Sequence, residues 1–291
     1  MICNLCPRDC HALRTPDSGG GVCGMPSVAV VAKCMLHNWE EPCLTGEHGA
    51  GAVFFAGCSL QCNYCQNRVI SRPGAARCQT VDVAGLREMF RDLIRRGAAC
   101  LDLVTPTHFT HVVREALRGE QYPVPVVWNS GGYEKPDTLR TLNGLVQVYM
   151  PDLKYALPEP AQAYSGAADY FQWAAAAILE MFRQTGRYRM ENGQLLSGVL
   201  IRHLILPGEI ENTRRVMDWV SRTFQPGDVL FSLMRQYTPQ PGATGKLARR
   251  VTGGEYRAAV AYMRNCGITD GYTQDAASAV SDYTPDFYQS L

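Results

Sequence analysis

The sequence lacks the features that direct a chain to a membrane or to nucleic acid. It has no apolar run long enough to span a bilayer and no run of Lys or Arg, and its formal net charge is +1. Met1-Ile2-Cys3 leads directly into polar, cysteine-containing sequence, so we expect no signal peptide. No internal repeat or low-complexity tract is visible. These absences predict a cytoplasmic protein with neither a nucleic-acid nor a membrane partner.

The composition is that of a globular protein. Apolar residues make up 46% of the 291 residues and charged residues 19%, enough for one domain of α/β-barrel size with a small appendage. The chain is also rich in cysteine, with twelve. In a chain without a signal peptide, so many cysteines favour metal ligation in a reducing compartment over disulfides.

Three cysteines form the most informative motif. Cys58, Cys62 and Cys65 are spaced C-x3-C-x2-C, and no fourth cysteine follows closely. A [4Fe–4S] cluster normally takes four thiolates, so three would leave one iron open to a small molecule. Such an iron would be oxygen-sensitive, which suggests an anaerobic setting. The alternatives are a zinc site, which usually needs four ligands in paired C-x2-C turns, and three unrelated buried cysteines.

A second group of cysteines lies in residues 1–45, which we interpret as a Cys-rich metal-binding segment. Cys3, Cys6, Cys10 and Cys23 are spaced to close a zinc site or to hold a second iron–sulfur cluster, and spacing alone does not separate the two. Partly free thiols are the alternative. The segment is short and polar, so a metal would supply much of its order. The other five cysteines are interpreted as small buried hydrophobic residues.

From residue 46 to 275 the chain alternates strand-like and helical patterns. The expected strands cover 52–56, 100–104, 124–128, 146–150, 199–206 and 229–234, and the expected helices 83–94, 111–117, 169–183, 212–223 and 255–265. Such alternation predicts an α/β fold with parallel βαβ units. About six units fit a partial (β/α)6 TIM-like barrel, followed by a tail over 276–291.

Polar residues follow each expected strand. Because the C-terminal ends of parallel strands meet on one face, these residues are expected to form one ligand site. The candidates are Tyr64, Asn67, Thr105, Thr107, His108, Asn129, Ser130, Asp152, Lys154, Arg202 and Gln236. For His108 the alternative is a hydrogen-bonded residue at the strand end, and for Asp152 and Lys154 it is a charge pair.

Several motifs together resemble one family over nearly the whole chain. They are C-x-L-C-P-R-x-C from Cys3, C-x-Y-C-Q-N from Cys62, V-T-P-T-H, N-S-G-G-Y, P-D-L-K-Y and M-x-Q-Y. The sequence is similar to radical S-adenosylmethionine (SAM) enzymes, and among them to PflX-like homologues of the activating enzymes of pyruvate formate-lyase and other glycyl-radical enzymes. The resemblance implies a barrel core and a [4Fe–4S] cluster on Cys58, Cys62 and Cys65 whose open iron binds SAM.

The resemblance also implies a reaction. One electron, from a partner such as flavodoxin or ferredoxin, cleaves SAM to a 5′-deoxyadenosyl radical that abstracts hydrogen from a protein or peptide substrate. In activating enzymes, the turn and strand end matched here by Asn129-Ser130 and Asp152-Leu153-Lys154 lie beside SAM. Two departures stand out. Thr105 occupies the place of a Gly-Gly-Glu turn, and Gln66 that of a frequent histidine.

One apparent substitute for the missing turn is rejected. Gly253-Gly254-Glu255 begins a helix after Thr252, which is typical of a capping box. Two rival functions remain open. In the first, the chain is a radical SAM enzyme whose substrate is a small molecule. In the second, it is a non-enzymatic iron–sulfur protein for electron transfer or redox sensing, which requires a cluster with four protein ligands.

Overall fold

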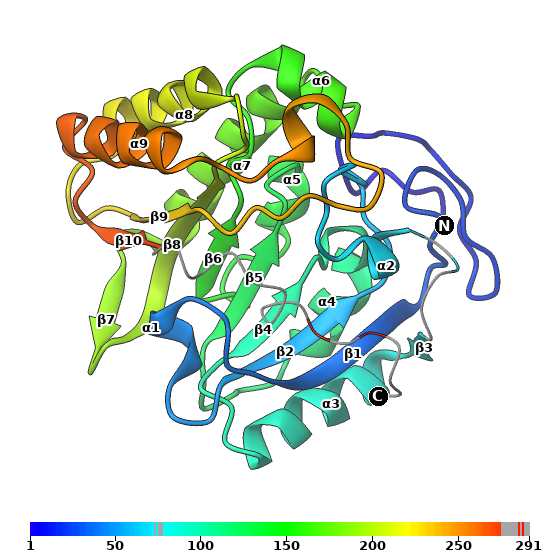
Figure 1. The fold of residues 1–291 in the computed structure, drawn as a ribbon. Helices are drawn as coiled ribbons and strands as arrows, with labels where there is room; N and C mark the ends of the chain where they lie inside the picture. The colour runs from blue at the N-terminus through cyan, green and yellow to red at the C-terminus, as the bar shows by residue number, and fades with distance from the viewer. Residues whose placement is uncertain (73, 75–77, 275–284, 286, 288–291) are drawn as a thin grey trace.

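The computed structural model describes residues 1–72, 74, 78–274, 285 and 287, so the expected 276–291 tail lies mostly outside the described residues. It shows a mixed α/β fold built on one ten-stranded sheet of order β10-β9-β8-β6-β5-β4-β2-β1-β3, with β7 paired to β8 (Figure 1). The strands are β1 (Ala29–His37), β2 (Ala50–Phe55), β3 (Gln79–Val81), β4 (Leu101–Val104), β5 (Val126–Ser130), β6 (Val148–Pro151), β7 (Arg189–Glu191), β8 (Gln194–Leu204), β9 (Leu230–Met234) and β10 (Gly271–Thr273).

The six strands expected from the sequence form the centre of this sheet. β2, β4, β5, β6, β8 and β9 pair in parallel and in chain order. β2, β4, β5, β6 and β9 are buried along their whole length, as central parallel strands are. Among the described strands the sheet stays open, because its ends, β3 and β10, each pair on one side only.

Helices connect the parallel strands. They are α1 (Pro42–Thr45), α2 (Arg68–Ser71), α3 (Val83–Arg95), α4 (Thr110–Leu117), α5 (Pro136–Arg140), α6 (Pro158–Ser165), α7 (Tyr170–Thr185), α8 (Ile210–Thr223) and α9 (Gly253–Asn265). Figure 1 shows α3 beside β1 and β2 and, at the other end of the sheet, α8 beside α9. The five predicted helices are therefore confirmed as α3, α4, α7, α8 and α9.

Two helix starts follow directly from local chemistry. The Asp82 side chain accepts a hydrogen bond from the Gly85 N–H at 2.8 Å, which caps α3. Thr252 and Glu255 form a reciprocal capping box at the start of α9, so this acidic residue stabilises a helix end as the sequence indicated.

The strand β1 was not predicted. It runs antiparallel to β2 and brings residue 37 opposite residue 50, at the start of β2. The chain then enters α1, whose Cys43 and Leu44 are buried against Cys100, Leu195 and Leu200. As a result, residues 38–42 begin beside the start of β2 and line the cavity described below. In the described part of the chain, no helix is long and apolar enough to cross a membrane.

Candidate functional site

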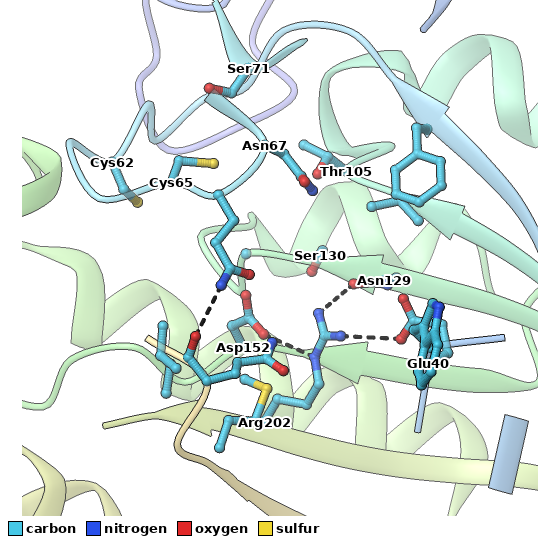
Figure 2. Close-up of a pocket in the computed structure, with 18 of the residues that line it drawn as sticks. Glu40, Cys62, Cys65, Asn67, Ser71, Thr105, Asn129, Ser130, Asp152 and Arg202 are labelled. Atoms are coloured by element: carbon cyan, nitrogen blue, oxygen red, sulfur yellow. Dashed lines mark hydrogen bonds and ion pairs between the residues drawn. The ribbon is translucent and has the colours of Figure 1, made fainter. Parts of the chain in front are cut away.

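A cavity of about 500 Å³ lies at the C-terminal ends of the central strands and extends toward residues 37–42 (Figure 2). Its walls come from the loop between β2 and α2, the ends of β4, β5, β6, β8 and β9, and residues 272–274. Twelve of the residues singled out from the sequence line it, namely Cys58, Cys62, Tyr64, Cys65, Asn67, Thr105, Asn129, Ser130, Asp152, Lys154, Arg202 and Gln236. The parallel topology thus gathers segments separated by up to 178 residues into one site.

The loop after β2 presents three thiols to this cavity. Gly57 allows the turn, because it has φ +79° and a Cβ there would collide with Met25. Burial, followed by the neighbouring Cys62 and Cys58, raises the pKa of Cys65 to about 12. Without a metal the Cys65 thiol is therefore protonated at neutral pH, and a metal that takes the place of its proton would balance the negative charge of the sulfur.

Hydrogen bonds hold two of these sulfurs in place. The Ser165 hydroxyl donates to Cys62 Sγ at 2.9 Å, and the Leu60 N–H points at Cys58 Sγ at 3.4 Å. Tyr64 belongs to the same loop, and its hydroxyl accepts a hydrogen bond from Tyr155 at 2.9 Å. It is almost fully buried and meets Tyr155 edge to face, so its ring supports the loop from inside.

Arg202 is the centre of a charged network on the opposite wall (Figure 2). Its guanidinium donates to Asp152 Oδ1 at 3.0 Å, to Asn129 Oδ1 at 2.6 Å and to Glu40 Oε2 at 3.4 Å. Lys154 Nζ lies 2.5 Å from the other oxygen of Asp152. Burial opposes ionisation of Asp152, but these two cations hold its pKa below the ordinary value. Asp152 and Lys154 thus form the charge pair considered as an alternative in the sequence analysis.

Three acidic residues of this region were missed by the sequence analysis. Glu40 and Glu41 line the cavity from the segment after β1, and Asp102 is fully buried in β4 behind them. Burial raises the pKa of Glu40, with Arg202 opposing the change. Burial and then the adjacent Glu40 raise the pKa of Asp102 well above its ordinary value. The only sequence signal was a pair of acids followed by Pro42, which reads as ordinary surface sequence.

Thr107 and His108 do not line the cavity, in contrast to their predicted role. Thr105 has φ +59°, and this left-handed turn directs the following residues away from the cavity. The Thr107 hydroxyl donates to Glu134 Oε1 at 2.9 Å. His108 Nε2 donates to the Ala56 carbonyl at 2.7 Å, and burial lowers the pKa of His108 to about 4. Both residues therefore serve internal packing, which is the alternative that the sequence left open for His108.

The N-terminal cysteines gather next to the loop after β2. Cys3, Cys6 and Cys23 are buried, whereas Cys10 is exposed. Arg8, between Cys6 and Cys10, donates to the carbonyls of Ser59 at 2.7 Å and Ser165 at 2.6 Å. Within the part of the chain that the structure describes, no three Cys, His, Asp or Glu side chains lie close enough together to hold a single metal ion.

Comparisons with known proteins support the fold. No family model matches the sequence. The uncharacterized protein MJ0674 of Methanocaldococcus jannaschii is 25% identical over 249 residues, which is 82% of this chain and 66% of that protein. The crystal structure of Streptococcus suis SuiB bound to precursor peptide SuiA aligns with TM-score 0.51 and 10% identity over 75% of this chain and 47% of SuiB. The chain spans less than two thirds of the length of either protein, and the likeness to SuiB shows a shared fold.

Proposed function

We propose that this protein is a radical SAM enzyme that uses a [4Fe–4S] cluster on Cys58, Cys62 and Cys65. The observation that carries the proposal is the convergence of this C-x3-C-x2-C loop with polar strand ends on one cavity. Among the described residues these three are the only cysteines that line the cavity, so a cluster bound there would keep the open position that SAM requires. Bound there, the cluster would supply the one electron that reductive cleavage of SAM requires, and the radical so formed would take a hydrogen atom from the substrate.

The chain's own residues would orient SAM against this loop. Lys154 is buried and interacts electrostatically with Cys62 and Cys65 as well as with Asp152. Its ammonium is therefore well placed to bind the SAM carboxylate beside the thiolates. Asn67, Thr105, Asn129, Ser130, Arg202 and Gln236 supply further hydrogen-bonding groups on the same wall. Asp152, which Arg202 and Lys154 keep ionised, orients the side chains of both residues through its ion pairs with them.

We further propose that the substrate is a protein or peptide. The sequence resemblance to activating enzymes of glycyl-radical enzymes supports this, as does the shared fold with SuiB, which was crystallised with a precursor peptide. A low-potential flavodoxin or ferredoxin would supply the electron in a reducing, anaerobic cytoplasm. A small-molecule substrate is the main rival, because a fold does not determine the substrate.

The N-terminal cysteines are proposed to bind a second metal, zinc or iron–sulfur. Arg14 is fully buried, and within the described residues its guanidinium meets carbonyl oxygens and Cys3 Sγ, at 3.4 Å, without forming an ion pair. A buried cation of this kind is balanced when neighbouring thiols are ionised by a metal. The metal content of a C58A/C62A/C65A variant tests this, because any metal that remains belongs to Cys3, Cys6, Cys10 and Cys23, and it should disappear when Cys23→Ala is added.

The function is tested by anaerobic reconstitution with iron and sulfide. After reduction with dithionite and addition of SAM, 5′-deoxyadenosine is measured by mass spectrometry. We expect product from the wild type and from Cys34→Ala, whose side chain lies outside the cavity, and none from Cys62→Ala. Product from Cys62→Ala equal to that of the wild type would refute the cluster assignment. An intact cluster whose EPR spectrum does not change when SAM is added would favour the electron-transfer alternative.

A further inference from the structure

A serine hydroxyl from a distant helix points at one sulfur of the cysteine loop. Ser165 is the last residue of α6, and its hydroxyl donates to Cys62 Sγ at 2.9 Å, although 103 positions separate the two residues. Both residues are buried, so little water competes for the sulfur. The Leu60 N–H, by comparison, is 3.4 Å from Cys58 Sγ. If Cys62 binds a cluster as a thiolate, the hydrogen bond from Ser165 becomes charge-assisted, which strengthens it.

The backbone fixes the distance between this hydroxyl and the sulfur. The N–H of Asn63, directly after Cys62, donates to the carbonyl of Tyr164, directly before Ser165, at 2.9 Å. The guanidinium of Arg8 also donates to the carbonyl of Ser165 itself at 2.6 Å. The end of α6 and the cysteine loop are therefore held together on both sides of the serine, and its hydroxyl reaches the sulfur without a movement of either segment.

A buried tyrosine holds the serine side chain from the other side. The hydroxyl of Tyr155 is hydrogen-bonded to Ser165 Oγ at 2.7 Å and to the Tyr64 hydroxyl at 2.9 Å. Burial, followed by the nearby Cys62, raises the pKa of Tyr155 well above its ordinary value, so its hydroxyl stays protonated. Tyr155 ends the P-D-L-K-Y motif but does not line the cavity, so contact with SAM does not explain its place there.

Hydrogen bonds to ligand sulfurs change the equilibrium between the two oxidation states of an iron–sulfur cluster. Reduction by one electron adds negative charge to the cluster and its thiolates, and a donor that points at a ligand sulfur stabilises that charge. This stabilisation is larger in a buried site than in water, because the local dielectric constant is low. A hydroxyl donor at Cys62 is therefore expected to favour the reduced cluster.

We propose that Ser165, held in place by Tyr155, is a positioning residue that raises the reduction potential of the cluster through the sulfur of Cys62. The inference rests on the proposed function, because it requires a cluster on Cys58, Cys62 and Cys65. It goes further by assigning to two residues outside the cavity the control of how readily the cluster takes up its electron. A cluster that is reduced more readily can accept its electron from a weaker reductant.

The test is an EPR-monitored redox titration of the full-length protein, reconstituted anaerobically and measured without SAM. Ser165→Ala removes the donor and should shift the one-electron equilibrium roughly tenfold toward the oxidised cluster, which lowers the potential by about 59 mV. Tyr155→Phe keeps the ring and should shift the potential in the same direction by a smaller amount. Ser165→Thr keeps the hydroxyl and should restore most of the wild-type potential.

The matched control is Ser221→Ala. Ser221 lies on α8, where it is hydrogen-bonded to the thiol of Cys266, and neither residue lines the cavity. This variant loses a hydroxyl beside a cysteine that is not a proposed ligand, so its cluster should keep the wild-type potential. The iron and sulfide contents of every sample are measured as well, which separates the loss of the cluster from a change in its potential.

The possible results separate the inference from the proposed function. At equal iron content, a wild-type potential in Ser165→Ala would overturn the inference and leave the proposed function intact. If Ser165→Ala holds no cluster, an unchanged potential in Tyr155→Phe overturns the inference instead. A shift in Ser165→Thr as large as that in Ser165→Ala would also overturn it, because packing rather than the hydroxyl would then control the potential. A wild-type protein that binds no cluster would overturn both.

Discussion

Two buried carboxyl groups on neighbouring segments of the sheet have opposite surroundings. Glu134, just after β5, accepts hydrogen bonds from Thr107 Oγ1 at 2.9 Å, Trp128 Nε1 at 2.8 Å and Ser130 Oγ at 2.6 Å. Burial raises the pKa of Glu134, and the three donors oppose that rise. Glu134 thus has the full set of donors that a buried structural carboxyl group needs.

Asp102 in β4 is equally buried but lacks such donors. Among the described residues its partners are Asn129 Nδ2, which donates at 3.3 Å, and the adjacent carboxyl group of Glu40, which after burial raises the pKa of Asp102 still further. The comparison teaches that burial and a raised pKa do not by themselves identify a functional acid. What separates the two sites is the kind of partner: Glu134 accepts hydrogen bonds from three neutral donors, whereas Asp102 is adjacent to a second carboxyl group, with which it must share a proton.

The largest effect that sharpens this comparison is expected for Glu134→Ala. Its removal leaves the hydroxyls of Thr107 and Ser130 and the indole N–H of Trp128 without their acceptor, which should cost about 4 kcal/mol of unfolding free energy. Urea denaturation measures this, with the m value checked for constancy. The exposed control Glu159→Ala should change stability by no more than about 0.5 kcal/mol. A loss below about 1 kcal/mol for Glu134→Ala would mean that water satisfies the donors.

The same contrast between satisfied and unsatisfied groups exists for two buried histidines, and it predicts a pH effect. In His203, Nδ1 contacts the Leu153 carbonyl at 2.7 Å and Nε2 the Thr213 hydroxyl at 3.0 Å, whereas His108 has a partner at Nε2 only among the described residues. Burial lowers the pKa of each to about 4. Folding therefore favours the neutral ring.

The direction of this pH effect follows from the difference between the folded and unfolded pKa values of the histidines. The two rings are protonated near pH 6.5 in the unfolded chain and only near pH 4 in the folded protein. Their contribution to the free energy of unfolding is therefore fully present above pH 6.5 and is lost as the pH falls toward 4. Each histidine contributes up to about 3 kcal/mol. Urea denaturation at intervals from pH 7.5 to 4 measures the loss, and His108→Gln should reduce its slope. An unchanged slope in that variant would show that His108 is hydrated.

Much of this arrangement was accessible from the sequence because the signals are local. The apolar runs of the six central strands and the Asp82 and Thr252 caps depend on neighbouring residues only, and the structure contains them. The convergence of Asn129 and Asp152 followed from one further rule, that parallel strands end on the same face.

The residues that escaped prediction depend on nonlocal or unusual backbone geometry. Glu40 and Glu41 reach the cavity because β1 pairs antiparallel with β2 and returns the chain to the start of β2, a pairing without periodic signal. His108 was misplaced because Thr105 adopts a left-handed conformation, which threonine rarely does. The sequence shows which polar residues follow a strand, but it does not show a turn that reverses their direction.

A smaller effect concerns Arg8, a cation that donates four hydrogen bonds to carbonyl oxygens. Arg8 donates to the carbonyls of Ser59, Ser165 and Gly166 at 2.5 to 2.7 Å, and so ties the N-terminal segment to the cysteine loop and to the end of α6. Arg8→Ala should cost about 2 kcal/mol and increase amide hydrogen exchange in residues 58–62. Arg8→Lys should be intermediate, because an ammonium lacks the planar fork. Equal exchange in all three proteins would show that the loop is held by other contacts.

The smallest expected effect has the opposite sign to that of Glu134→Ala, because replacing Asp102 should raise the free energy of unfolding. Asp102→Asn keeps an oxygen for Asn129 and adds an N–H beside Glu40, so stability at pH 7 should rise by about 1 kcal/mol rather than fall. Because the folded pKa of Asp102 is raised, the wild type loses stability as the pH rises from the unfolded value near 4, and the advantage of the variant should grow over the same range. Urea denaturation of both proteins at pH 4, 6 and 8 measures this. A variant less stable than the wild type at pH 8 would mean that Asp102, like Glu134, is a structural acid.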